Sequence, residues 1–205
     1  MRTKSIPFAL LTALSLATTG CGVAEQGRSS SLVRITVLEG ASGAKPDTFS
    51  GTLLSDVLTM VLVNQVSVPT TFNDNGRVTM AVALKDYGAP GSTSAPGPLN
   101  SVTFTHYRVV FRRTDGRNVQ GVDVPYGFDS GLTFTVPSDG TATAVFEIVR
   151  HSAKDEAPLK ALVASGGLIS VIADVTFYGR DGGGKDVQVT GSMGIDFGNF
   201  ADPTS

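Results

Sequence analysis

The chain has 205 residues with 16 basic and 18 acidic side chains, and this mildly acidic balance argues against nucleic acid as a partner. Twenty-four glycines, ten prolines and frequent valine and threonine favour short strands joined by turns over helices. The chain has no tryptophan, which weakens any carbohydrate-binding interpretation, because sugar sites commonly rely on aromatic platforms.

The N-terminus has the layout of a secretory signal peptide. Arg2 and Lys4 form a positive region, residues 6–17 are apolar, and residues 18–20 are small. An apolar run of about a dozen residues is too short to span a bilayer as a permanent helix, which needs about 20. We therefore expect residues 1–20 to be an export signal.

Cys21, the only cysteine, follows this segment directly and has no partner for a disulfide. The arrangement resembles the lipobox of bacterial lipoproteins, although Thr18 stands where that family usually has an aliphatic residue. The resemblance implies that Cys21 becomes the acylated first residue of the mature protein, and Gly22 fits sorting to the outer membrane. The simpler alternative is an incidental free thiol with cleavage at another residue. Residues 21–31 read as a flexible tether that would hold the domain some 15–20 Å from the acyl chains.

Apolar and polar residues alternate with the period of half-buried strands from residue 32 to residue 197. Turn clusters such as Asp115-Gly116 and residues 181–184 separate most of these runs. The inward positions are Val33, Ile35 and Val37; Val78, Met80, Val82 and Leu84; Tyr107, Val109 and Phe111; Leu132, Phe134 and Val136; Ala144, Phe146 and Ile148; Val171, Ala173, Val175 and Phe177; and Val187, Val189, Met193, Ile195 and Phe197.

Seven or more such strands without long helices predict an all-β fold, an antiparallel β-sandwich in one domain over residues 32–200. The C-terminal hairpin resembles the last strands of bacterial immunoglobulin-like domains, which implies an Ig-like sandwich but transfers no functional residues. Residues 53–62 fit a helical stripe as well as a strand, and we favour a strand. Residues 155–165 predict one short helix ended by Gly166. Residues 88–98 form a low-complexity loop, interpreted as exposed within the domain rather than as a linker.

His106, Arg108 and Arg112 are predicted to share one face of a strand over residues 103–113. Such a basic stripe could bind an anionic ligand such as a lipid head group or an acidic glycan. The more frequent alternative is a solvated face paired with acids on a neighbouring strand, for which Asp123 and Glu147 are the candidates.

Asp181 and Asp186 flank a glycine-rich loop and are weak candidates for calcium ligands, because calcium binds carboxylates in loops of exported β domains. Lys185 lies between them and would repel a cation, and aspartate and glycine are also ordinary turn formers. His106 and His151 are the only histidines, and no nucleophile elbow, P-loop or zinc motif is present.

The sequence therefore predicts a non-enzymatic, lipid-anchored protein of the bacterial envelope, without a cofactor, that presents an Ig-like domain to an envelope protein or glycan. The loop at residues 88–98 and its neighbours are the expected contact region. The alternative is a carrier that holds a lipid or small apolar ligand between splayed sheets.

Overall fold

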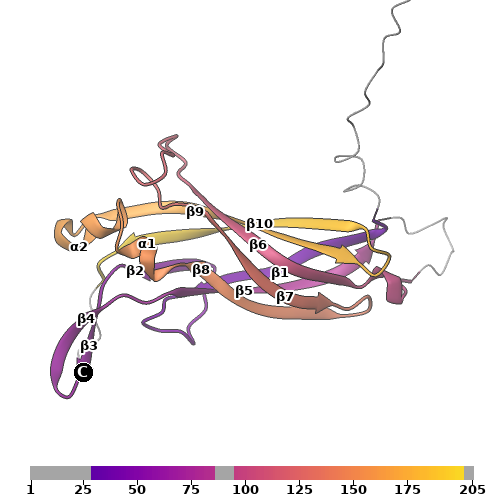
Figure 1. The fold of residues 1–205 in the computed structure, drawn as a ribbon, viewed down its shortest axis with the longest axis horizontal. Helices are drawn as coiled ribbons and strands as arrows, with labels where there is room; N and C mark the ends of the chain where they lie inside the picture. The colour runs from indigo at the N-terminus through magenta and orange to yellow at the C-terminus, as the bar shows by residue number, and fades with distance from the viewer. Residues whose placement is uncertain (1–28, 86–94, 201–205) are drawn as a thin grey trace, which may run out of the picture.

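The computed structural model describes residues 29–85 and 95–200, and within them the protein is mostly β-strand. The signal segment and Cys21 lie outside the described residues. Figure 1 shows an elongated domain whose long strands run along its main axis. The all-β prediction is therefore confirmed.

One sheet has three antiparallel strands in the order β1-β5-β8. Their bounds are Ser31–Ala41 for β1, Asp74–Leu84 for β5 and Thr141–Val149 for β8. Their inward side chains, among them Val33, Val78, Met80, Phe146 and Ile148, are buried.

A second sheet has five strands in the order β2-β10-β9-β6-β7. Their bounds are Thr52–Asp56 for β2, Val102–Arg112 for β6, Phe128–Val136 for β7, Leu168–Asp181 for β9 and Asp186–Gly198 for β10. Neighbours within β10-β9-β6-β7 are antiparallel, whereas β2 pairs with β10 in parallel. The expectation of a purely antiparallel arrangement is thus wrong at this edge, because β2 runs alongside the last strand instead of returning in a hairpin.

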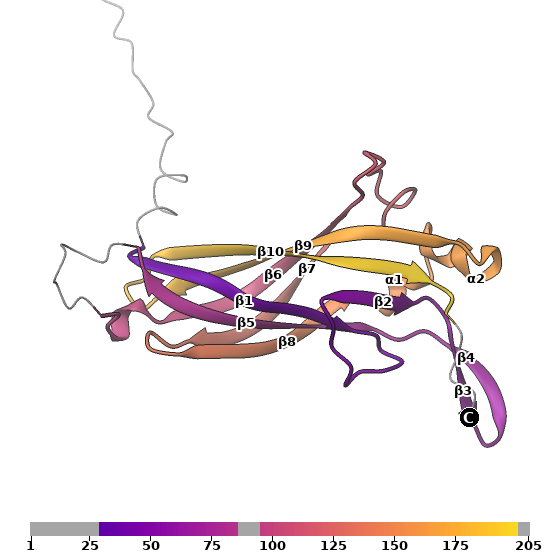
Figure 2. The same ribbon diagram turned by 180° about the vertical axis from the view of Figure 1, so that it is seen from behind.

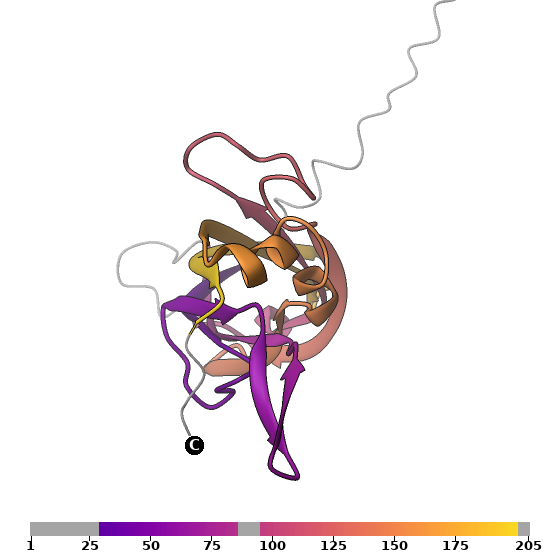
Figure 3. The same cartoon turned by 90° about the vertical axis from the view of Figure 1, so that its left-hand side faces the viewer.

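The two sheets pack face to face (Figure 3), and the core between them contains many aromatic side chains. Tyr107 on β6 crosses this core and donates a hydrogen bond of 2.8 Å from its hydroxyl to the backbone oxygen of Glu147 on β8. Its ring meets Phe146 of the opposite sheet at a centroid distance of 5.0 Å. Aromatic side chains therefore fill the central space between the sheets.

Strand β1 contains a bulge that the alternation did not predict. Its register against β5 shifts between Ile35 and Val37, so Val37 turns outward and is 37% exposed. Leu38 takes the inward position in its place and packs against the core. The extra residue reverses the alternation for the rest of the strand, because a one-residue slip exchanges the two faces.

The strand prediction for residues 53–63 is confirmed for most of them: residues 53–56 lie in β2 and residues 59–63 form β3, Thr59–Val63, with Val57 and Leu58 between the two strands. Strand β3 pairs with β4, Val66–Thr70, in a separate two-stranded sheet that projects from one end of the domain (Figures 1 and 2).

The predicted helix over residues 155–165 is wrong at its start, where residues 155–158 form turns and a bend. Only the 3-10 turn η2, Leu159–Ala161, and α2, Leu162–Ser165, lie within the predicted range, and a short helix α1, His151–Lys154, precedes it. Gly166 ends α2 in the left-handed conformation with φ of 59°, as its place in the sequence predicts. A further 3-10 turn, η1, spans Pro98–Asn100 before β6.

Candidate functional site

The candidate site lies on the outward face of the five-stranded sheet. Strand β6 places His106, Arg108 and Arg112 on this exposed face and buries Tyr107, Val109 and Phe111, whereas Val110 shares the exposed face. The structure therefore brings the three predicted residues onto one surface.

Arg108 is paired with a carboxylate on the neighbouring strand β7. Its Nε and Nη2 donate to the two oxygens of Asp129 at 2.8 and 3.1 Å, a bidentate pair in which both side chains are about half exposed. The hydrogen bond and charge of Arg108 lower the pKa of Asp129. Asp129 keeps its charge under all ordinary conditions and neutralises this part of the stripe.

Arg112 makes a similar pair with Asp174 on the other neighbour, β9. The Nε of Arg112 lies 2.6 Å from Oδ2, and the hydroxyl of Ser192 on β10 donates to Oδ1 at 2.5 Å. Burial raises the pKa of Asp174, but the donors Arg112 and Ser192 outweigh this effect and the pKa is lowered. Both arginines are thus paired with acids on neighbouring strands.

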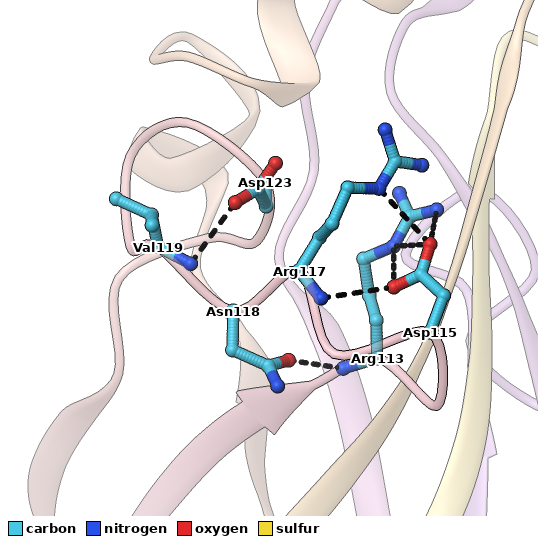
Figure 4. A network of polar contacts seen from close by, with 6 residues as sticks. All are labelled: Arg113, Asp115, Arg117, Asn118, Val119 and Asp123. Carbon is cyan, nitrogen blue, oxygen red and sulfur yellow. Dashed lines mark hydrogen bonds and ion pairs between the residues drawn. The ribbon is translucent and has the colours of Figure 1, made fainter.

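The acids proposed from the sequence are the wrong ones. Asp123 belongs to the loop between β6 and β7, where it accepts the backbone N–H of Val119 at 3.1 Å (Figure 4). In the same loop Asp115 is bound by Arg113 and Arg117. Glu147 lies on β8 of the opposite sheet.

His106 is stacked on Tyr178 of β9. The two rings are nearly parallel, with an angle of 7° and a centroid distance of 4.7 Å. His106 is exposed and Tyr178 is half-buried. The pair presents an aromatic surface to solvent on a face that also carries hydroxyls, ion pairs and the exposed side chain of Val110.

A shallow groove of about 580 Å³ opens beside this stacked pair. It is lined by Thr103, Thr105, His106, Tyr178, Gly179, Arg180 and Asp186. A Cβ at Gly179 would lie 2.3 Å from the carbonyl oxygen of Thr103, so only glycine permits this approach of β9 to β6. The approach occurs beside the register shift between Phe104 and His106, which turns consecutive residues 105 and 106 to the exposed face.

The two aspartates proposed as weak metal ligands have partners in the chain. Asp186 accepts Nε of Arg180 at 2.8 Å across the groove end. Asp181 is buried, and its Oδ1 accepts the backbone N–H groups of Gly183 and Lys185 at 2.9 and 2.8 Å. Within residues 29–85 and 95–200, no group of three or more histidine, cysteine or acidic side chains is placed to hold a metal ion.

Asp181 also fixes the start of the described chain. The hydroxyl of Ser29 donates to its Oδ2 at 2.7 Å, so the end of the tether lies against the β9–β10 turn. Gly182 of that turn touches Leu99 of η1, and its N–H donates to Ser101. The groove, the tether end and the residues that follow the 88–98 loop therefore share one end of the domain. Cys21 and residues 88–94 of the loop lie outside the described residues.

Sequence reasoning missed Tyr178, Asp129 and Asp174. Alternation alone places Tyr178 outward, because its neighbour Phe177 is an inward residue. That β9 lies between β6 and β10 is a property of the topology, and no local pattern encodes it. The sequence therefore indicates that Tyr178 is exposed, but it does not indicate that Tyr178 contacts His106.

A second cleft, of about 290 Å³, lies at the other end of β1. It is largely apolar, with Leu53, Leu54 and Phe200 in its walls and Lys45 and Asp56 among its polar residues. It lies beside the loop of residues 42–50.

In the part of the chain that the structure describes, no helix has the length and apolar character needed to cross a membrane. Comparisons of the chain with protein-family models, with curated proteins and with solved structures found no match.

Proposed function

We propose that this protein is a non-enzymatic lipoprotein of the bacterial envelope that binds a glycan through the groove at His106 and Tyr178. Acyl chains on Cys21, palmitate among them, anchor it in the outer membrane. The support for the anchor is the charged, apolar and small residues that precede Cys21 in the order of an export signal.

We further propose that the domain is an Ig-like sandwich. The strand order supports this: β1-β5-β8 corresponds to strands A, B and E of such a domain, and β10-β9-β6-β7 to strands G, F, C and C′. In this correspondence Tyr107, on strand C, fills the core position that immunoglobulin domains give to a tryptophan.

The observation that carries the glycan proposal is the stacked pair of His106 and Tyr178 in the wall of an open groove. Aromatic faces bind the C–H surface of a sugar ring, and the hydroxyls of Thr103 and Thr105 suit its hydroxyl groups. The exposed ion pair of Arg180 and Asp186 adds charged donors and acceptors at the groove end. Together, the stacked aromatic pair, the hydroxyls and the ion pair compensate for the lack of tryptophan.

The position of the groove also favours an envelope glycan. Because Ser29 is bound at the same end of the domain, the groove lies next to the tether. A coil of about eight residues, the separation of Cys21 and Ser29 along the chain, would keep it about 14–17 Å from the acyl chains. Saccharides at or near the membrane surface are within this reach.

The test uses the purified full chain and two probes from the native envelope, peptidoglycan sacculi and lipopolysaccharide. We expect one of them to bind, and Tyr178→Ala to weaken binding at least tenfold. Tyr126→Ala is the matched control, because Tyr126 is 48% exposed but lies outside the groove, and it leaves binding unchanged. Equal effects of the two substitutions, or binding of neither probe, contradict the proposal and favour a protein partner.

The second candidate function, a carrier of a small apolar ligand, is favoured by the apolar cleft at Leu53, Leu54 and Phe200. Its occupant would lie beside the sheets, since aromatic rings fill the space between them. A carrier copurifies with lipid that mass spectrometry detects, and Leu54→Asp removes that lipid. A lipid-free preparation argues against this function.

A further inference from the structure

The β3–β4 hairpin exposes apolar side chains on both of its faces. Cross-strand pairing puts Val61, Val63, Val66 and Val68 on one face, and Met60 and Leu62 on the other. Leu62 and Val66 are 55% and 62% exposed. Surface patches of this kind mark interaction sites when they are contiguous.

The hairpin lacks the usual protection against a partner. No charged residue occurs from residue 57 to residue 73. Among the described residues, β3 and β4 pair only with each other, and the hairpin projects from the end of the domain that is farthest from residue 29 (Figures 1 and 2). An isolated two-stranded sheet is marginally stable in water, and further strands would stabilise it.

The turn determines which backbone groups face outward. Asn64 and Gln65 both have positive φ, 51° and 66°, as in the two-residue type I′ turn. Such a turn makes Val63 and Val66 the closing hydrogen-bonded pair. Because pairs alternate, the N–H groups of Met60 and Leu62 point away from β4, to the free edge of β3.

The two edges of the hairpin are therefore different. Pro69 pairs with Met60 and has no N–H to offer at the outer edge of β4, which is a common way to block an edge strand. Strand β3 has no proline, no charge and no register shift. Within residues 29–85 and 95–200, no strand pairs with this edge of β3, so the edge is available to another strand.

We propose that β3 pairs antiparallel with β3 of a second copy, about a two-fold axis at Val61, to form a four-stranded sheet. This register places Met60 opposite Leu62 and Val61 opposite itself. Self-pairing brings like residues together, so a charge in the strand would repel itself, and the uncharged strand avoids this penalty. A second copy is thus the partner that the strand fits best.

The first test is disulfide trapping of the full chain in membranes of the native host. Val61→Cys should give a covalent dimer on non-reducing gels, because the two Cβ atoms would lie about 5 Å apart. Val68→Cys is the matched control on β4, about 14 Å from its copy across three strand spacings, and it should give at least fivefold less dimer. The unsubstituted chain, with Cys21 alone, sets the background.

The second test removes one outward N–H. In the Val61→Cys background, Leu62→Pro should reduce the dimer at least fivefold. Ser67→Pro, on the opposite edge of the same pair, should leave it unchanged. Equal far-ultraviolet circular dichroism of both variants controls for folding. If Val61→Cys gives no more dimer than Val68→Cys, or the two prolines act equally, the β3 pairing is wrong and the hairpin meets a bilayer or another protein.

Discussion

The ammonium group of Lys154 lies 2.8 Å from Oδ1 of Asp74, and both side chains are almost completely buried, with exposed fractions of 1% and 0%. Asp74 also accepts the hydroxyl of Ser55 and the backbone N–H of Gly43. Burial raises the pKa of Asp74, and the charge of Lys154 opposes this rise. The pair joins β5, α1, β2 and the loop after β1 at one point.

We predict that Asp74→Ala destabilises the domain by about 3–5 kcal/mol, because it leaves a buried ammonium group without its counter-ion. Urea unfolding followed by circular dichroism measures the loss. The double variant Asp74→Leu with Lys154→Met replaces the pair with apolar groups and should be more stable than Asp74→Ala alone. A double variant that is at least as unstable as Asp74→Ala would show that packing, not charge, dominates here.

Gly179→Ala tests the close approach that shapes the groove. A methyl group would lie 2.3 Å from the carbonyl oxygen of Thr103, so the strands must separate at a cost of about 1–3 kcal/mol. Gly131→Ala on β7 is the control, because its Cβ would meet no atom within 4 Å. We expect thermal unfolding to show a loss for Gly179→Ala and a change within about 0.5 kcal/mol for Gly131→Ala.

Alternation in the sequence predicted the long strands well because one face of each is buried. Tyr107, Val109 and Phe111 are all inward, as their spacing indicates. The alternation could not predict the register shift after Ile35, because a bulge depends on how β1 pairs with β5 and leaves no sequence pattern of its own.

The site was predicted only as far as one strand defines it. The common face of His106, Arg108 and Arg112 follows from period two. Their partners Tyr178, Asp129 and Asp174 come from the strands on either side of β6, and strand order is set by packing of the whole domain. Asp123, predicted as a partner of these arginines, instead accepts a hydrogen bond from the backbone of its own loop.

The buried hydroxyl of Tyr107 allows a direct test of the contact between the sheets. Tyr107→Phe removes the hydrogen bond to the backbone oxygen of Glu147 and should cost about 1 kcal/mol. For a domain of this size the melting temperature should fall by about 2–4 °C. Tyr126→Phe, at an exposed position, should leave it unchanged. If both variants lower the melting temperature equally, the loss does not come from the hydrogen bond between the sheets.

Acid should weaken the β9–β10 turn through Asp181. Burial raises the pKa of Asp181, but hydrogen bonds from Ser29, Lys185 and Gly183 outweigh this, and the pKa is lowered from 3.8. The folded state therefore binds the proton less readily than the unfolded state, so this contribution is present above pH 3.8 and is lost as pH falls through the lower folded value. Asp181→Asn should make stability less dependent on pH below about 4, as followed by urea unfolding. An unchanged pH profile would contradict this role.

The anchor proposal predicts a covalent lipid on Cys21. Cells of the native host grown with an alkyne analogue of palmitate should label the wild-type protein and leave Cys21→Ser unlabelled, because the hydroxyl cannot form the thioether of a lipoprotein. Thr18→Leu supplies the aliphatic residue that the lipobox family usually has, so its label should be equal or stronger. Labelling is a better readout than fractionation, since an uncleaved apolar segment at residues 6–17 would itself retain the variant in the membrane. Equal labelling of wild type and Cys21→Ser would place the lipid elsewhere, and no labelling of wild type would remove the tether on which the position of the groove depends.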